Sequence, residues 1–213
     1  MTNRQVGGRL QPATVIDAAL ELLDEEGLDA LSTRAVADRL GVRMNTVLWH
    51  VKTKARMLDL MADAIVGEIS LDDLPDSSDE RAREIARRYR HAVLAHRDGA
   101  ALMAGTYPAE PHTLRAAEAL VAALLDSGRN ERDAAWTTWA VIYFTLGLTQ
   151  EEQSAGSQPV GQRLAAALAP DSHPALHRTL GHLAPGSFDD RFEFGLDSLL
   201  SPPQERPPSR ATG

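Results

Sequence analysis

The sequence lacks cysteine, and this absence excludes a disulfide framework and any metal site built on thiolates. It also lacks an apolar run near the roughly 20 residues that cross a bilayer. Its first residues, MTNRQVGGRL, lack the apolar core of a signal peptide. These absences predict a cytoplasmic protein that does not contact a membrane. With 213 residues, 43% of them hydrophobic, the chain can bury a sizeable core as one domain or two small ones.

Positive charge is scarce but concentrated in one segment. The net charge is −8, yet residues 1–56 hold eight Lys/Arg against seven Asp/Glu, so the rest of the chain carries −9. Residues 34–56 contain six basic side chains and a single acidic one, Asp38, and both lysines of the chain, Lys52 and Lys54, lie there. A basic segment in an acidic protein indicates a local contact with a polyanion. The alternative is an ordinary solvated face.

The fold class predicted from the residue pattern is all-α. No β-branched residues alternate over a convincing strand, whereas apolar residues recur at helical spacing along most of the chain. The polar segment 1–9 is expected to be a mobile arm, the Pro-rich tail 201–213 to be disordered, and segment 154–162, SAGSQPVGQ, to be a loop. Helices are expected over about residues 12–26, 33–40, 44–50, 54–69, 79–98, 112–127, 131–152, 175–183 and 188–200.

Residues that cap helix N-termini precede several of these segments. Their side-chain oxygens can accept a hydrogen bond from an N–H group of the first helical turn. The expected caps are Ser32 or Thr33, Thr53, Asn130 with Asp133, and Ser187 with Asp190.

The stretch STRAVADRLGVRMNTVLWHVKTK, residues 32–54, combines a short helix, a turn opened by Gly41 and a second short helix. This length pattern is typical of a helix-turn-helix, in which glycine adopts the left-handed conformation at the turn. The second helix of such a motif lies in the major groove of DNA, with its N-terminal residues facing base edges. The alternative is a helical hairpin without this function.

The residues at the start of the second helix suit base recognition. They are Arg43, Met44, Asn45 and Thr46. Arginine suits guanine and asparagine suits adenine, whereas threonine contacts bases or phosphates. Lys52 and Lys54 follow where phosphate oxygens flank the groove.

The segment VIDAALELLDEEGLDALSTRAVADRLGVRMNTVLWHVKTKARMLDLM resembles the N-terminal domain of the tetracycline repressor (TetR) family. The stretch LWHVKTK brings it close to the tetracycline repressor class. The similarity continues in patches through HRDGAALMAGTYP, YFTLGLTQEEQ and FEFGLDSLL, so that it spans about residues 10–200. The resemblance implies a homodimer of helical subunits. In each, a three-helix DNA-binding domain joins a ligand-binding core through a fourth helix, and the long helix and the last helix form a four-helix dimer bundle.

The resemblance also implies DNA contacts at matched positions. Leu48 stands where the class has a phosphate-contacting tyrosine, and Met44 and Asn45 replace a Gln-Pro pair, so the operator sequence is expected to differ. The implied contacts are Thr33, Arg34, Met44, Asn45, Thr46, Leu48, Trp49, His50 and Lys54.

The effector is expected to differ from tetracycline. The class holds its ligand as a magnesium chelate, through a histidine and, by way of water, a glutamate. Glu151 falls at the glutamate position, but Met103 falls at the histidine position, and a thioether does not ligate Mg²⁺. Ile85 and Ala119 replace two further polar contacts. We therefore expect a small, largely apolar effector, aromatic or polyketide-like, that binds without a metal cofactor and releases the repressor from DNA. The expected lining is Ile85, Tyr89, Met103, Thr106, Tyr107, Trp139 and Glu151, and the alternative for each aromatic residue is core packing.

These observations predict a helix-turn-helix domain over residues 10–56 and an effector-binding and dimerisation domain over 57–200. The sequence has no glycine-rich phosphate loop, HExxH pair or GxSxG elbow, so an enzyme is not expected. The three histidines at 173, 177 and 182 favour a solvated helix over a metal site. The leading hypothesis is a ligand-responsive repressor that binds double-stranded operator DNA. The alternatives are an enzyme or carrier with a helical pocket, and an architectural DNA-binding dimer without an effector.

Overall fold

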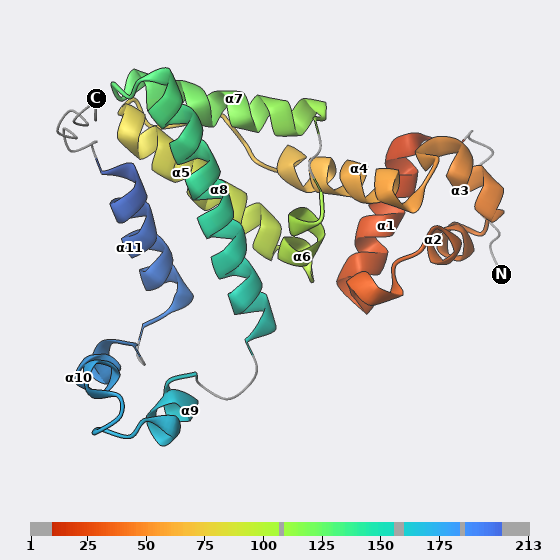
Figure 1. The fold of residues 1–213 in the computed structure, drawn as a ribbon. Coiled ribbons are helices and arrows are strands. Elements are labelled where there is room, and N and C mark those ends of the chain that lie inside the picture. The colour runs from red at the N-terminus through yellow and green to blue at the C-terminus, as the bar shows by residue number, and fades with distance from the viewer. Residues whose placement is uncertain (1–9, 107–108, 156–159, 184–185, 202–213) are drawn as a thin grey trace, which may run out of the picture. The chain divides into compact units, whose positions relative to one another are not determined.

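The computed structural model describes residues 10–106, 109–155, 160–183 and 186–201, with the backbone alone for residues 160–163. Within these ranges the chain forms α-helices, one 3-10 helix and no strand, which confirms the all-α prediction (Figure 1). The chain divides into two compact units. The first unit comprises residues 1–71 and 88–116, and the second comprises residues 72–87 and 117–213. Two helices contribute residues to both units.

The first unit contains the predicted helix-turn-helix segment and the turn that follows α5. Its helices are α1 (Pro12–Glu26), η1 (Leu28–Ala30), α2 (Thr33–Leu40), α3 (Met44–Val51), α4 (Lys54–Gly67), the last part of α5 (Ser78–Leu94), α6 (Gly99–Ala104) and the start of α7 (Pro111–Asp126). The second unit contains the first part of α5, the rest of α7, and α8 (Glu131–Ser154), α9 (Val160–Ala167), α10 (Pro174–Leu183) and α11 (Phe188–Leu200).

The predicted caps are present. Of the two alternatives at the start of α2, Ser32 is the cap. The side chains of Ser32, Thr53, Asn130 and Ser187 accept hydrogen bonds from the backbone N–H groups of Ala35, Arg56, Asp133 and Asp190, respectively. Asp190 also accepts a hydrogen bond from the Ser187 N–H and completes a capping box. Each cap satisfies a donor that the first helical turn cannot pair internally.

Two of the helix predictions were wrong at their C-terminal ends, and one loop prediction was wrong in part. The helix expected over 79–98 ends at Leu94, and α6 begins separately at Gly99. The helix expected to reach residue 69 ends at Gly67, and the segment expected to be a loop contains the start of α9.

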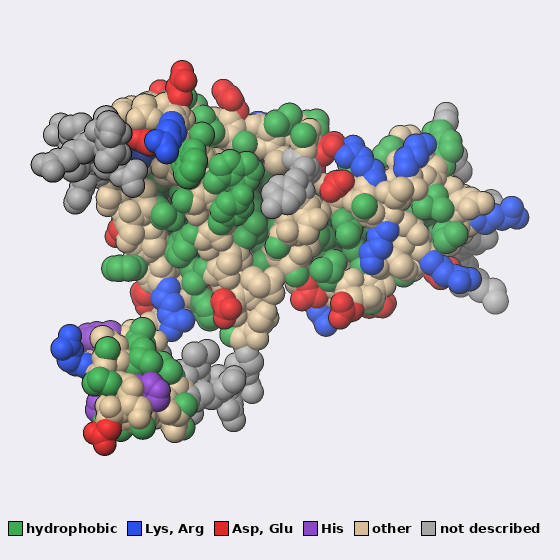
Figure 2. Space-filling model, in the orientation of Figure 1, with side chains coloured by type: hydrophobic (Ala, Val, Ile, Leu, Met, Phe, Trp, Pro, Cys, Tyr) green, Lys and Arg blue, Asp and Glu red, His purple; other side chains and the backbone are tan. Residues whose placement is uncertain are grey.

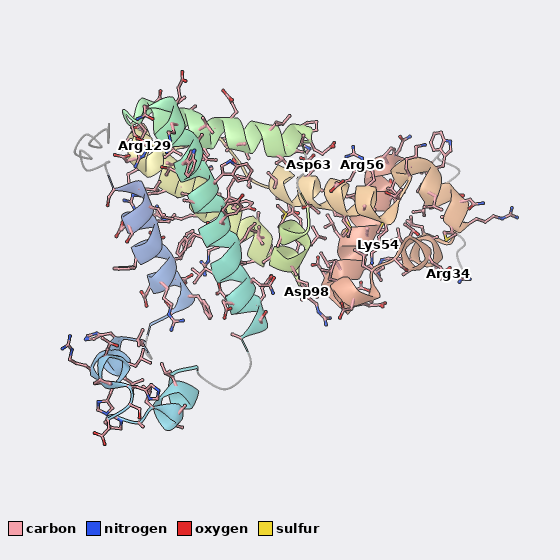
Figure 3. All side chains as sticks on the ribbon, viewed as in Figure 1. Arg34, Lys54, Arg56, Asp63, Asp98 and Arg129 are labelled. Carbon is pink, nitrogen blue, oxygen red and sulfur yellow. The ribbon has the colours of Figure 1, made fainter. Side chains whose placement is uncertain are left out.

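The early end of α5 has a tertiary cause. Asp98 has a positive φ of 55°, and its carboxylate accepts a 2.9 Å hydrogen bond from the Leu28 N–H group (Figure 3). A Cβ on Gly99 would lie 2.3 Å from the carbonyl oxygen of Val93, so only glycine allows the chain to turn there. The turn therefore depends on a contact with the first residue of η1.

The helix-turn-helix has its own apolar core. Side chains from α1, α2, α3 and α4 pack together, and each buried Val or Leu contributes about 1.5–3 kcal/mol relative to exposure. The fully buried members are Val15, Leu23, Leu31, Val36, Val47, Met57 and Met61.

In the second unit, α8 and α11 lie side by side and run in opposite directions (Figure 1). The rings of Phe144 and Phe192 stack at 5.9 Å between centroids, and a Cβ on Gly195 would lie 2.0 Å from the Phe144 ring, so the helices approach closely. The buried guanidinium of Arg129 donates a 2.7 Å hydrogen bond to the Leu200 carbonyl and thereby caps the end of α11 (Figure 3).

The apolar stripe of α11 is covered within its own chain, because Phe192, Leu196 and Leu200 are buried. The exposed aromatic side chain of α11 is Phe194, at 74% exposure. The helical periodicity predicts the buried stripe, and Phe194 lies outside it.

Candidate functional site

A tight turn holds α2 and α3 in the helix-turn-helix arrangement. Gly41 has φ 64° and ψ 30°, the left-handed conformation predicted for it. The N–H group of Val42 donates a 3.0 Å hydrogen bond to the Ala37 carbonyl, which closes the C-terminal end of α2. Val47 on α3 is fully buried. The geometry matches the motif predicted from the spacing.

The first turn of α3 presents its side chains to solvent. Arg43 precedes the helix, and Val47 and Val51 form its buried side. Four consecutive side chains at the start of the helix are exposed, namely Arg43, Met44, Asn45 and Thr46. A guanidinium, an amide, a hydroxyl and a thioether are thus available together at one helix end. These are side chains that contact base edges in a major groove.

The remaining residues predicted to contact DNA surround this helix. Arg34 on α2 and Lys54 at the first position of α4 are exposed (Figure 3). Trp49 is 59% exposed, and its ring meets the His50 ring edge to face at 4.8 Å. The less exposed members of the predicted set are Thr33, Leu48 and His50, which are half-buried.

Two of the six cations in the basic segment are engaged by carboxylates. Arg39 forms 2.7 Å hydrogen bonds with both oxygens of Glu25 and a further one with Glu21, which lowers the pKa of the Glu25 carboxyl. Arg56 forms an ion pair with Glu110. Among the described residues no carboxylate forms an ion pair with the other four, Arg34, Arg43, Lys52 and Lys54, and Lys and Arg side chains lie at the surface around α2 and α3 (Figure 2). Fewer cations are therefore available to bind a polyanion than the count of six in the sequence indicates.

Lys52 ends α3 in an unusual backbone conformation. Its φ is 64° and its ψ is −54°, and the N–H group of Thr53 donates a 2.7 Å hydrogen bond to the Val51 carbonyl across it. This is the geometry of a classic γ-turn, which is rare and strained for a residue with a side chain. The Lys52 ammonium donates to the Trp49 carbonyl at 2.9 Å and lies 5.7 Å from the centroid of its ring. The turn sets the ammonium beside the exposed surface of α3.

The residues predicted to line an effector site are divided between the two units. In the first unit, Met103 and Thr106 are buried, and the Thr106 hydroxyl donates to the Met103 carbonyl at 3.1 Å. Burial raises the pKa of the Tyr89 phenol, so it is a neutral donor at physiological pH. Tyr107 lies outside the described residues. The convergence of this set on one ligand stays a prediction.

In the second unit, Ile85 is buried on α5, at 2% exposure. Trp139 is 48% exposed on α8 and stacks on Tyr143 with 5.4 Å between ring centroids. Glu151 lies twelve residues further along α8 and is also exposed. Both predicted residues are therefore exposed and do not belong to the buried side of α8.

Sequence reasoning missed two buried polar groups on α8, the hydroxyls of Thr145 and Thr149. They fall on the stripe that also contains Ala134 and Val141, and threonine is too weakly polar for a hydropathy pattern to separate it from small apolar residues. No described group of His, Asp and Glu side chains has the arrangement of a metal site. None of the described helices combines the length and apolar character needed to cross a membrane.

An exposed, polar recognition helix held by a left-handed glycine turn against two supporting helices defines a helix-turn-helix DNA-binding protein. Comparison with known proteins agrees. Residues 15–61 match the model described as bacterial regulatory proteins, tetR family, and residues 73–202 match the tetracyclin repressor-like C-terminal domain. The chain belongs to the TetR family of ligand-responsive transcriptional regulators.

Individual relatives cover nearly the whole chain. The tetracycline repressor protein class A from transposon 1721 of Escherichia coli is 37% identical over 90% of this chain and 89% of its own length. A possible TetR family transcriptional regulator from Streptomyces coelicolor A3(2) has a TM-score of 0.79 and 37% identity, covering 89% of this chain and 97% of its own. The Streptomyces coelicolor TetR family protein ActR, crystallised with actinorhodin, has a TM-score of 0.81 and 28% identity, covering 90% and 93%.

Proposed function

We propose that this chain is a repressor that binds a two-fold symmetric operator as a homodimer, with α3 of each subunit in a major groove. The observation that carries the proposal is the unbroken exposed row of Arg43, Met44, Asn45 and Thr46 at the start of α3. Such side chains read base edges, whereas Arg34, Lys52 and Lys54 suit phosphate oxygens. A two-fold dimer places two such helices on half-sites about one helical turn apart or a multiple of it.

Exposed aromatic side chains of the second unit support the homodimer. Trp136 on α8 is 68% exposed, Tyr143 is 56% exposed, and Phe194 on α11 is 74% exposed. Hydrophobic side chains also lie at the surface along α8 (Figure 2). Large apolar groups clustered on a surface indicate an interface, because leaving them in water forgoes the hydrophobic free energy of burial. A second copy of the chain provides the matching surface in a two-fold arrangement.

We infer that the effector is aromatic or polyketide-like and binds without Mg²⁺. The class A relative is named a tetracycline repressor. The resemblance described above implies that this class holds its drug as a magnesium chelate. Here the buried thioether of Met103 stands at the histidine position, and a soft sulfur does not ligate a hard cation. The residues present therefore do not fit a magnesium chelate. The crystallisation of ActR with actinorhodin supports an aromatic polyketide as the effector class. We place the protein in the cytoplasm, where operator DNA is found.

The test begins with DNA selected by the purified full-length protein from a randomised pool. We expect a palindromic sequence, a dimer by analytical ultracentrifugation at micromolar concentration, and release of the selected duplex by actinorhodin or emodin, a hydroxylated anthraquinone. Tetracycline should not release it, whether Mg²⁺ or EDTA is present. Selection of non-palindromic DNA by a monomer would refute the dimeric repressor. Release by tetracycline that disappears on addition of EDTA would refute the metal-free effector.

A further inference from the structure

Two threonine hydroxyls on α8 are buried without a hydrogen bond. Thr145 and Thr149 are each 0% exposed, and neither Oγ1 atom has a partner among the described residues. Two other helical threonines donate their hydroxyls to a carbonyl of the preceding turn. Thr138 donates to the Ala134 carbonyl at 2.9 Å, and Thr179 donates to the Ala175 carbonyl at 3.0 Å. A carbonyl of the preceding turn is normally within reach of any helical threonine. The hydroxyls of Thr145 and Thr149 are unusual because they do not use it.

Burying two hydroxyls without hydrogen bonds is energetically unfavourable in the free protein. A buried hydroxyl has given up its hydrogen bonds to water, and without a protein partner it gains nothing in exchange. Such groups are uncommon in folded proteins, and each one calls for a physical reason. A ligand that offers an oxygen to each hydroxyl would restore both hydrogen bonds. The two groups are therefore positioned for a partner that the described residues do not provide.

The spacing of the hydroxyls constrains that partner. Thr145 and Thr149 are one turn apart on the same side of α8, about 6 Å along its axis. The rest of this side is apolar or internally paired, since Ala134 and Val141 are buried and Thr138 already has an acceptor. Trp139 and Glu151 are exposed and lie outside this buried stripe. Polar contacts on the buried side of α8 would thus come from these two hydroxyls.

Packing on the neighbouring flank keeps this part of α8 in place. Phe144, next to Thr145, stacks on Phe192 of α11, and Gly195 gives that ring its space. Close packing of this kind holds the backbone that carries the two hydroxyls. A rigid helix with two fixed hydroxyls selects a ligand by the distance between its oxygen atoms.

We propose that Thr145 and Thr149 are the hydrogen-bonding anchors of the effector, and that the effector is a planar aromatic molecule with two oxygen atoms about 6 Å apart. This inference rests on the proposed effector class. A threonine hydroxyl both donates and accepts, so it pairs with a quinone carbonyl or with a phenol. The two carbonyl oxygens of a quinone ring have a separation of this order. The apolar side chains on this side of α8 contact the ring system of the effector. The two hydroxyls fix the position of the effector along α8.

The first experiment measures the free protein. Valine has the shape of threonine without its hydroxyl, so Thr145→Val and Thr149→Val remove only the unpaired group. We expect the melting temperature of each variant to equal or exceed that of the wild type. The matched control is Thr138→Val, which removes a hydroxyl that has an acceptor and should lower the melting temperature. A decrease in Thr145→Val and Thr149→Val as large as in Thr138→Val would overturn the proposal, because the hydroxyls would then be paired in the free protein.

The second experiment measures emodin binding by quenching of tryptophan fluorescence and, separately, by release of the selected operator. We expect Thr145→Val and Thr149→Val each to raise the dissociation constant about fivefold, and the double variant roughly 25-fold. Thr138→Val should remain within about twofold of the wild type, and Thr145→Ser and Thr149→Ser should restore binding because they keep the hydroxyl. Unchanged emodin affinity in the valine variants, with a wild type that binds, would refute the anchors and leave the proposed effector class standing. A wild type that fails to bind emodin would refute both.

Discussion

Asp63 on α4 accepts two 2.8 Å hydrogen bonds from Thr113, one from its backbone N–H group and one from its hydroxyl (Figure 3). Thr113 lies in the first turn of α7, where N–H groups have no partner inside the helix. The Asp63 carboxylate is buried at 6% exposure, so a residue of one helix caps the start of another. Its negative charge also suits the positive end of the α7 dipole.

Replacing the Asp63 carboxylate should therefore destabilise the first unit. We expect Asp63→Ala to lower the free energy of unfolding by about 2 kcal/mol, measured by urea denaturation, because it leaves two donors unpaired. Thr113→Val removes the hydroxyl bond alone and should cost about 1 kcal/mol or less. Equal losses in the two variants would show that the backbone N–H bond contributes nothing.

The ion pair of Arg56 with Glu110 should make stability depend on pH. The guanidinium holds the pKa of the Glu110 carboxyl below its ordinary value of 4.5. A carboxyl whose pKa is lowered by folding stabilises the protein above its unfolded-state value, and this contribution is lost as the pH falls through the lowered pKa. The stability difference between the wild type and Glu110→Gln should thus be present at about pH 7 and shrink below about pH 4.5. Urea denaturation across this range measures it.

Glu118→Gln is the matched control for this titration. Glu118 is exposed on α7 and forms no ion pair among the described residues. Its removal should leave the pH profile of unfolding unchanged. A profile for Glu110→Gln that runs parallel to the wild type at all pH values would contradict the assigned coupling.

Two substitutions of Lys52 separate the effect of backbone strain on stability from the effect of its ammonium on DNA binding. Its φ of 64° and ψ of −54° suit glycine better than lysine, so Lys52→Gly should raise the free energy of unfolding by about 1 kcal/mol. Lys52→Ala keeps the strain and should not stabilise. Both variants lose the ammonium, so both should weaken DNA binding. Each should also reduce the slope of log K against log salt concentration by about one. A glycine variant no more stable than the alanine variant would show that the turn is not strained.

Asn45 and Lys54 should differ in how they contribute to DNA binding. Asn45 is exposed in the first turn of α3, and we expect Asn45→Ala to cost roughly 1–3 kcal/mol on the selected operator but little on random DNA. Lys54→Ala should weaken binding to both DNAs equally, because a phosphate contact carries no sequence information. Fluorescence anisotropy at several salt concentrations measures both effects. Equal losses on operator and random DNA for Asn45→Ala would contradict a base contact.

Local features of this fold were predictable because their determinants lie within a few residues. Ser32 and Ala35 are three residues apart, as are Asn130 and Asp133, so a cap can be recognised from the sequence. Gly41 predicts the turn of the helix-turn-helix, because the conformation of that turn depends on the glycine itself. The helical spacing of Val47 and Val51 likewise indicates which side of this short helix is buried.

Features that depend on distant residues were not predictable. The end of α5 at Leu94 depends on Asp98 reaching Leu28, which lies 70 residues earlier in the sequence. The His96 imidazole lies 3.1 Å from an Asp24 oxygen and 3.0 Å from a Glu68 oxygen, and no spacing pattern indicates that contact. Arg39 also forms an ion pair with Glu25, so it is less available to bind DNA, and a count of charges cannot show this.

The sequence by itself thus determined the class of fold, the recognition helix and its caps, because hydrogen bonds within one helical turn and the 3.6-residue period act over short stretches of chain. Only the tertiary structure decided which cations remain available to DNA, where α5 ends, and that Thr145 and Thr149 are buried without partners. Those outcomes depend on which distant side chains share a space, and a helical period does not encode that.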